Sequence, residues 1–463
     1  MEGSVIGTLK ISFYTPHKGL METPRTKRMR HCSNSNRNLM DLDNDNLVDI
    51  FSRLPAESVC SVGCVSKALH NIVSRPSFLN QHMSSLVTTN AAAEVPQLVI
   101  VSQSKKKYMA ELIAMQSFEY DGNTLEMRRD KTRIVSKIMS WWYEYFFNVH
   151  FVFCNLICLK DRHTGSRCVL LNPLKGEAVM LPTCIVQVPE HLKTTVFSYY
   201  WFGMGFDNTT STHKVVQVCA DSEYNYCVSH VYVLGTRSWR EICSVPPCDL
   251  TVKNLSAYGD MHWLIRRATT GRAQANIRHC MSILSFDFKK EEFGWNIPDP
   301  PLRNMPRKFH SVQRFHLINL RGSLSVVDAS SDKYLDIWML KNYDEKEWVL
   351  VHRIEARMIN AECRYRSYRL WTCCEWGHGI FFKRSRKSNS TVVLLDLRTV
   401  CIHRVKCPIY QKGLYTSIFS YTSSLISLKS YGNLIPLKRY GKPTEAEESR
   451  RSGSSMNIWH LCN

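Results

Sequence analysis

The sequence lacks the motifs by which most catalytic sites are recognised. It contains no G-x-S-x-G, no G-x-x-x-x-G-K-[ST] and no H-E-x-x-H, and the Gly-Met-Gly run at 203–205 has no third glycine. Its 18 cysteines include no C-x-x-C pair, and spacings such as Cys60/Cys64 and Cys154/Cys158 have no matching second pair. We therefore expect no intrinsic enzyme activity, no cofactor and no metal site.

Acidic residues are scarce, with 40 Asp+Glu against 60 Lys+Arg and a formal net charge of +20. This balance favours acidic partners, whether nucleic acid, an anionic surface or an acidic protein. The start MEGSVIGTLK has no charged segment followed by an apolar one, so we expect reduced thiols and a location in the nucleus, the cytoplasm or both. Residues 1–38 are a basic extension, and PRTKRMRH at 24–31 is either a nuclear import signal or a solvated arm.

Long apolar runs are almost absent as well. A membrane helix needs about 20 predominantly apolar residues, and one window, residues 141–159, approaches that length. This window contains the polar residues Glu144, Asn148, His150 and Asn155. We interpret this window as buried strands and expect no membrane association.

Helical periodicity is clear in LDNDNLVDIFSRLPAESVCSVGCVSKALHNIVSRPSF, residues 42–78. A first helix is predicted to end at Pro55, a second to cover 56–62, and a third to begin near Cys64 and end at 74–76. The first has Leu47, Ile50, Phe51 and Leu54 on one face with Asn44 or Asp45 as a cap, and the third has Val65, Leu69, Ile72 and Val73. Three helices this short bury little surface alone, so such a unit commonly needs a partner.

A helix-turn-helix DNA reader is one alternative for three short helices. Such a unit needs Lys or Arg on its last helix to meet phosphates and base edges. This one offers Lys67 and His70, and residues 39–83 carry five acids against three bases, a net charge of −2. We therefore expect that this unit does not bind nucleic acid.

The same stretch resembles an F-box of the plant type, LPxDLxxEILxRLPxxSLxxxxxVCKxWxxLISxPxF. It departs from that pattern at Asp43, Asn46 and Leu69. The resemblance implies that residues 39–83 dock on a Skp-type adaptor, which links the chain to cullin and RING subunits. The residues it implies for adaptor binding are Leu42, Leu47, Ile50, Phe51, Leu54, Pro55, Val59, Val65, Lys67, Leu69, Ile72 and Phe78.

Residues 95–430 have the composition of β-strands. Five stretches share a strand, a charged or Gly-containing turn and a second strand: RCVLLNPLKGEAVMLP, HVYVLGTRSWREI, SILSFDFKKEEFGWNI, LDIWMLKNYDEKEWVLVHRI and TVVLLDLRTVCIHRVK. Leu170, Val233, Phe286, Trp338 and Leu395 mark them at steps of 63, 53, 52 and 57 residues. A period of about 50 predicts an all-β, β-propeller-like domain of the kelch type, with Trp239, Trp338 and Trp348 between blades.

These stretches also resemble the F-box-associated interaction domain of plant proteins. VLLNPLKGEAVMLP is similar to its WNP-x-T-x-E-x-x-x-LP element, and FGMGFDNTTSTHKVVQV to its GFGYDxxTxxYKVV element. YGDMHWL, FDFKKEEF, INLRGSL, LDIWMLKNYDEKEWV and YTSSLISL follow in the family's order. Residues 431–463 are then a tail, disordered in part.

These observations predict a substrate-recognition subunit of a Skp/cullin/F-box ubiquitin ligase, without catalysis of its own. The alternative is a basic propeller that binds RNA or chromatin and carries a vestigial F-box. For the protein substrate we expect an acidic or phosphorylated segment, because RRATTGRAQANIRHC at 266–280 contains Arg266, Arg267, Arg272 and Arg278 and no acid. This stretch is predicted to be a loop on one rim of the propeller.

Overall fold

The structure is a computed structural model. It describes residues 42–88, 97–106, 109–120, 125–127, 133–135, 147–153, 156–161, 166–186, 199–221, 226–251, 254–270, 277–302, 314–331, 333–356, 372–377, 379–384, 391–406, 414–421 and 425–435. The chain divides into two compact units, Met1–Asp43 and Asn44–Asn463. All the helices and strands named below belong to the second unit.

Four helices, not the expected three, open the second unit: α1 (Asn44–Ser52), α2 (Ala56–Gly63), α3 (Lys67–Val73) and α4 (Pro76–Thr88). The predicted end of the third helix at 74–76 is correct, because α3 ends at Val73 with Ser74 as its C-cap, but the fourth helix was not predicted. Pro76 is the first residue of α4, a position where the missing N–H of proline costs no hydrogen bond and its fixed φ suits the helix.

The start of the third helix was also predicted too early. Val65 precedes α3, and Ser66 caps that helix because its Oγ accepts a hydrogen bond from the Leu69 backbone N at 3.2 Å. The spacing of four residues between Val65 and Leu69 is therefore not a helical repeat.

The four helices share one small apolar core. Its buried members are Leu47, Phe51, Ala56, Val59, Leu69, Ile72, Val73 and Phe78. The core also contains Leu425, from the far end of the chain.

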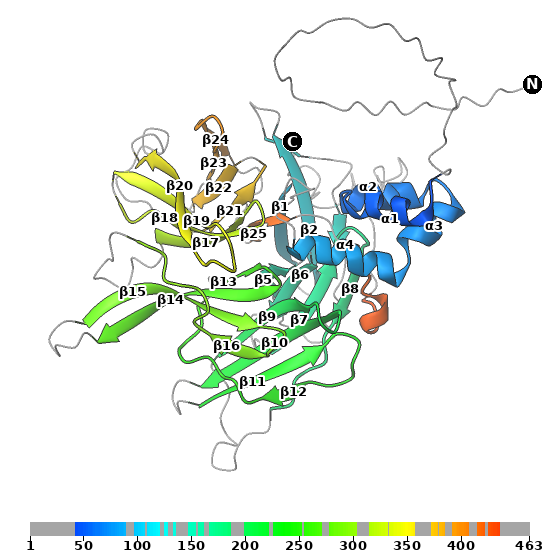
Figure 1. Ribbon diagram of the computed structural model, residues 1–463, viewed down its shortest axis with the longest axis horizontal. Coiled ribbons are helices and arrows are strands. Elements are labelled where there is room, and N and C mark those ends of the chain that lie inside the picture. Colours follow the sequence, from blue (N-terminus) through cyan, green and yellow to red (C-terminus); the bar gives the residue numbers. More distant parts are fainter. Residues whose placement is uncertain are drawn as a thin grey trace, which may run out of the picture. The chain divides into compact units, whose positions relative to one another are not determined.

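The strands form six antiparallel sheets within the described residues (Figure 1). The first three sheets are β5 (Phe147–Phe153), β6 (Leu156–Asp161), β7 (Cys168–Asn172) and β8 (Glu177–Met180); β9 (Tyr199–Asp207), β10 (Thr212–Asp221), β11 (Tyr226–Val233) and β12 (Arg240–Ile242); and β13 (Asn254–Ala257), β14 (Asp260–Thr270), β15 (Ile277–Asp287) and β16 (Glu292–Gly294).

The next two sheets are β17 (Phe315–Leu320), β18 (Ser323–Asp328), β19 (Tyr334–Leu340) and β20 (Trp348–Glu355); and β21 (Thr372–Trp376), β22 (Gly379–Arg384), β23 (Thr391–Asp396) and β24 (Ile402–Lys406). The sixth sheet contains β25 (Leu414–Tyr421), β1 (Gln97–Lys106), β2 (Met109–Tyr120), β3 (Leu125–Met127) and β4 (Arg133–Val135).

The sixth sheet closes the six sheets into a ring. The inner strand of each sheet lies against the inner strand of the next sheet. In order around the ring these strands are β5, β9, β13, β17, β21 and β25, and β25 contacts both β21 and β5. The strand β25 pairs antiparallel with β1, so the two ends of the propeller sequence are joined by a backbone ladder. The fold class is therefore confirmed: a small helical unit followed by a β-propeller.

The sequence repeat corresponds to the outer hairpins of successive blades. The five stretches form β7–β8, β11–β12, β15–β16, β19–β20 and β23–β24. Five tight turns of the propeller share one chemistry, in which an Asn or Asp side chain accepts the backbone N–H two residues later and the residue four positions later has positive φ. The pairs are Asn172/Gly176, Asp207/Ser211, Asp287/Glu291, Asn342/Lys346 and Asp396/Val400.

Two of the three tryptophans predicted to lie between blades, Trp239 and Trp348, bond to the preceding blade. Trp239 donates its Nε1–H to the Pro182 carbonyl at 2.7 Å, and Trp348 donates to the Pro298 carbonyl at 2.9 Å. Each bond joins one sheet to the segment that leaves the preceding sheet. Trp338 is half-buried.

The apolar window at 141–159 is β-structure where it is described, in β5 and β6. Residues 141–146 and 154–155 lie outside the described residues. The described part of the chain contains no helix long and apolar enough to cross a membrane.

Candidate docking surfaces

Burial divides the twelve residues predicted for adaptor binding into two groups. Six are core of the helical unit and are exposed by 4% or less: Leu47, Phe51, Val59, Leu69, Ile72 and Phe78. These side chains support the fold and offer no surface to a partner. The other six are Leu42, Ile50, Leu54, Pro55, Val65 and Lys67, which are exposed or half-buried.

Among the described side chains of α1 to α4 and their turns, Ile50 and Val65 are the exposed large apolar residues. Ile50 is 43% exposed on α1, and Val65 is 75% exposed in the turn before α3. Ile50 shares the heptad-like spacing of Leu47 and Phe51 but not their burial, so periodicity alone could not separate it from the core. Leu42 is 42% exposed and belongs to the first unit.

A buried histidine shapes the turn after α1. His82 of α4 is 2% exposed, and its Nε2 lies 3.0 Å from the Leu54 carbonyl oxygen. Burial lowers the pKa of His82, which keeps the ring neutral. The half-buried Leu54 and Pro55 are thus held from behind by α4, a contact that the sequence did not reveal.

An exposed ion pair lies close to Ile50 in the sequence, at the end of α1. Arg53 donates to both carboxylate oxygens of Asp49, at 2.8 and 2.9 Å, one helical turn apart. The two side chains are 74% and 56% exposed, so this ion pair adds little to stability. Lys67 is exposed at the start of α3.

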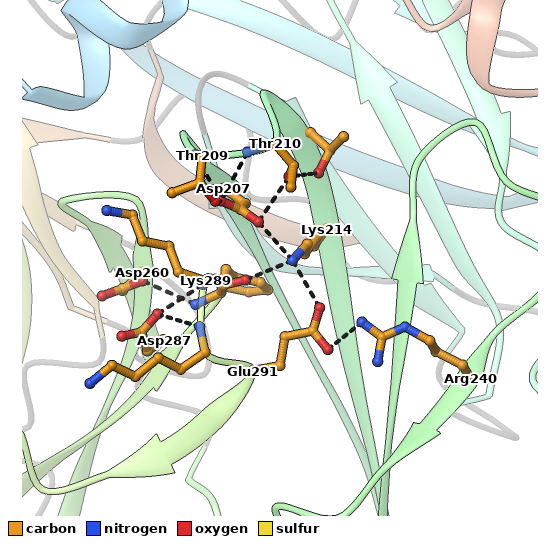
Figure 2. Close-up of polar contacts among 12 residues, drawn as sticks. Asp207, Thr209, Thr210, Lys214, Arg240, Asp260, Asp287, Lys289 and Glu291 are labelled. Atoms are coloured by element: carbon orange, nitrogen blue, oxygen red, sulfur yellow. Dashed lines mark hydrogen bonds and ion pairs between the residues drawn. The ribbon is translucent and has the colours of Figure 1, made fainter.

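The propeller contains a buried ionic network between two blades (Figure 2). Lys214 of β10 places its Nζ 2.9 Å from Asp207 Oδ2 and 2.8 Å from Glu291 Oε1, and donates to the Phe288 carbonyl at 3.0 Å. Arg240 pairs with the other oxygen of Glu291. The network fixes the β9–β10 hairpin to the β15–β16 turn.

The ionised forms are favoured inside this network. Burial opposes ionisation of Asp207, but hydrogen bonds from Thr209, Lys214 and Thr210 outweigh it and hold the carboxyl pKa well below its usual range. Burial likewise opposes the charge on Lys214, yet its bonds to Glu291 and Asp207 raise the pKa of the ammonium. All three donors of Lys214 have acceptors, so we interpret the network as structural.

Two carboxyl groups, the half-buried Asp260 and the buried Glu375, join the next blades. Asp260 accepts from the Tyr343 hydroxyl at 3.1 Å and from the Phe288 backbone N at 3.3 Å. Glu375 accepts from the Arg321 backbone N at 2.8 Å. Burial raises the pKa of Asp260 and of Glu375 to about 7.

These contacts place the tight turns of neighbouring blades on one rim of the ring. We name it the turn rim, formed by the turns at 207–211, 258–259, 287–291, 321–322 and 342–346. Because antiparallel strands reverse at each turn, the connection between the second and third strands of a blade lies at the opposite rim, here named the connection rim.

The arginine-rich stretch is mostly strand, which corrects the predicted loop. Arg266 and Arg267 lie in β14 and Arg278 in β15, where Arg267 pairs with Cys280 and Arg278 with Thr269. The two strands extend farther than expected because their backbone ladder continues to Thr270–Ile277. Arg272 falls outside the described residues. The end of this hairpin lies at the connection rim.

Comparison with protein families identifies both parts. The model of the F-box associated beta propeller domain matches residues 98–425, and the F-box domain model matches residues 39–81. The chain belongs to the F-box proteins with an F-box-associated β-propeller. Proteins of this kind are generally non-catalytic substrate receptors.

Relatives in Arabidopsis thaliana agree with this family. F-box protein At3g07870 is 26% identical over 336 residues, which cover 67% of this chain and 71% of that protein. F-box protein CPR1 is 22% identical over 452 residues, covering 90% and 95%, respectively. F-box protein At1g53790 is 25% identical over 323 residues, covering 66% of this chain and 62% of that protein.

No set of three metal-ligating side chains comes together in the part of the chain that the structure describes. The described cysteines that are buried include Cys158 and Cys168, whose Sγ atoms lie 3.1 Å apart. Burial raises the pKa of the Cys158 thiol well above its usual value, which disfavours the thiolate. This pair therefore packs as thiols within the propeller.

Proposed function

We propose that this F-box protein is the substrate-recognition subunit of a Skp/cullin/F-box ubiquitin ligase. The observation that carries the proposal is the exposure of Ile50 and Val65 on an otherwise well-packed F-box, since apolar side chains outside a small core are expected where a partner completes it. The partner is a Skp-type adaptor, and cullin and RING subunits join through it. Leu54, Pro55 and Lys67 contribute at the edges of the contact.

In this proposal the propeller holds the protein to be ubiquitinated, in the nucleus, the cytoplasm or both. Chemistry belongs to the other subunits, and this chain raises the effective concentration of substrate lysines near the loaded ubiquitin. The ring is a rigid scaffold, and connections at its rim are suited to binding.

For the substrate we propose an acidic or phosphorylated segment bound by Arg266, Arg267, Arg272 and Arg278. Support comes from the position of Arg266, Arg267 and Arg278 on the two strands of one hairpin, which runs toward the connection rim. The guanidinium fork suits carboxylate and phosphate groups. Changing Arg266, Arg267 and Arg272 together to Ala should leave adaptor binding intact, weaken substrate recovery, and remove the salt dependence of capture.

The test of the whole proposal is affinity purification of the full chain with the ligase chemically stalled. We expect a Skp-type adaptor and a substrate in the wild-type eluate, and loss of the adaptor in Ile50→Asp. The matched control is Ile185→Asp, an 87% exposed isoleucine of the propeller, which should retain the adaptor. Recovery of nucleic acid that survives high salt, without any adaptor, would instead favour the basic propeller that binds RNA or chromatin.

A further inference from the structure

The segment after the last strand of the ring contacts the F-box. Leu425, 4% exposed, belongs to the same buried cluster as Leu47 and Phe51, and Leu174 of the β7–β8 turn packs against that cluster. Cys60 of α2 packs there too and lies close enough to Lys175 to interact with it electrostatically. The F-box core therefore continues into the propeller.

Buried hydrogen bonds fix this segment to the blade that carries Leu174. Asn172 donates its side-chain amide to the Ile426 carbonyl at 2.6 Å. Glu177 accepts from the Leu428 backbone N at 2.6 Å and from the Ser427 hydroxyl at 3.2 Å. Each bond links a side chain near position 175 to a residue about 250 positions later, which holds residues 426–428 against the blade.

The attachment continues past residue 430, where the sequence predicted a tail. Ile435 donates its backbone N–H to the Ala178 carbonyl at 2.8 Å, and Leu434 pairs with Val179 of β8. Tyr431 packs against the propeller core, and its ring centroid lies 6.3 Å from that of His213. The propeller thus extends to at least residue 435, and the β7–β8 turn joins the turn rim.

We propose that residues 425–435, which we name the strap, are a positioning element that holds the F-box against the turn rim of the propeller. The strap follows β25, the strand that closes the ring, so closure of the propeller and placement of the F-box depend on one segment. Resting on the proposed function, this means that substrate on the connection rim is presented at a fixed distance and angle from the adaptor.

The first test uses the unmodified chain and an amine-to-thiol cross-linker with a short spacer. Burial lowers the pKa of Lys175, which leaves more of its amine reactive. Mass spectrometry should find Lys175 joined to Cys60, and the product should disappear in Lys175→Arg. Absence of this cross-link from the folded wild-type chain would overturn the proposal.

The second test measures amide hydrogen exchange in Leu174→Ser/Leu425→Ser. Loss of the shared core should speed exchange in α2 about 10-fold or more while β13–β16 stay protected. The control is Leu397→Ser, which changes an equally buried leucine of the propeller, also 4% exposed, away from the strap. It should leave α2 exchange and the Lys175–Cys60 cross-link as they are in the wild type.

Unchanged α2 exchange in the folded double variant would also overturn the proposal. Neither test depends on a ligase partner. If the chain shows the Lys175–Cys60 cross-link but binds no adaptor, only the proposed function is contradicted. If the chain binds the adaptor but shows no cross-link, only the role of the strap is contradicted.

Discussion

The F-box and the propeller differ in how much apolar surface they leave exposed and in how they are held together. Among its described side chains, the F-box packs eight buried apolar residues of its own into one core yet leaves Ile50 and Val65 exposed. The propeller arranges six separate sheets in a ring that the β25–β1 ladder closes, and it pairs buried charges across blades, as at Lys214. A small unit with exposed apolar side chains depends on a partner, whereas a ring that pairs buried charges across its blades keeps its own shape.

The largest effect is expected where a buried charge loses its partner. Lys214→Met should lower the free energy of unfolding by about 3–5 kcal/mol, because Asp207 then remains buried without its cation. The matched surface change, Arg53→Ala in the F-box, should cost about 0.5 kcal/mol or less. Urea unfolding followed by tryptophan fluorescence and circular dichroism measures both. Equal costs for the two variants would contradict the difference that we draw between the regions.

A second prediction distinguishes residues that stabilise the F-box core from residues that are exposed for partner binding. Phe51→Ala should destabilise the helical unit by about 3 kcal/mol or more, because it opens a cavity in a small core. Ile50→Ala, one residue away, should cost about 0.5 kcal/mol, since its side chain is already 43% exposed. Thermal unfolding monitored at 222 nm tests the pair. If Ile50→Ala were as destabilising as Phe51→Ala, Ile50 would belong to the core.

The third prediction concerns pH and the carboxyl groups between blades. The pKa of Asp260 is raised by burial to about 7 in the folded chain, against about 4 for an unfolded aspartate. Its contribution to stability is therefore complete below pH 4 and is lost as the pH rises to 7. Asp260→Asn should flatten this part of the stability profile, and Glu375→Gln should do the same.

Urea midpoints measured at each pH from 4 to 8 provide the check. The difference between wild type and variant isolates the carboxyl group from buried histidines such as His262, whose pKa burial lowers to about 4. A profile for Asp260→Asn that parallels the wild type would show that this carboxyl is ionised in the folded protein.

The smallest effect should come from two turn residues with nearly the same backbone. Lys346 has φ 55° and Glu291 has φ 60°. Lys346→Gly should stabilise the chain by about 0.5 kcal/mol, because glycine adopts this conformation without strain. Glu291→Gly should destabilise it, because Lys214 and Arg240 lose their shared carboxylate. Differential scanning calorimetry resolves the opposite signs, and a stabilising Glu291→Gly would show that the network adds nothing.

Features that follow from local sequence patterns could be predicted from the sequence. Features that depend on contacts between residues far apart in the chain could not. The outer hairpins were predictable because their strands alternate with turns of fixed chemistry, as at Asn342 to Lys346. The sequence identified twelve residues for adaptor binding but could not separate the buried ones from the exposed ones. Ile50 and Phe51, for example, are neighbours with the same helical periodicity, and only the packing around them shows that Phe51 is buried and Ile50 is exposed. The strap was missed because Leu425 and Asn172 meet across about 250 residues, which no local periodicity records.

Affinity for a Skp-type adaptor tests the central claim most directly. Isothermal titration of the adaptor into wild type, Ile50→Asp and Val65→Asp should show loss of at least about 3 kcal/mol of binding, more than 100-fold in Kd, for each variant. Far-UV circular dichroism should be unchanged in both, because the two side chains lie outside the core. Ile185→Asp should bind as the wild type does. Wild-type affinity in both F-box variants would contradict the account.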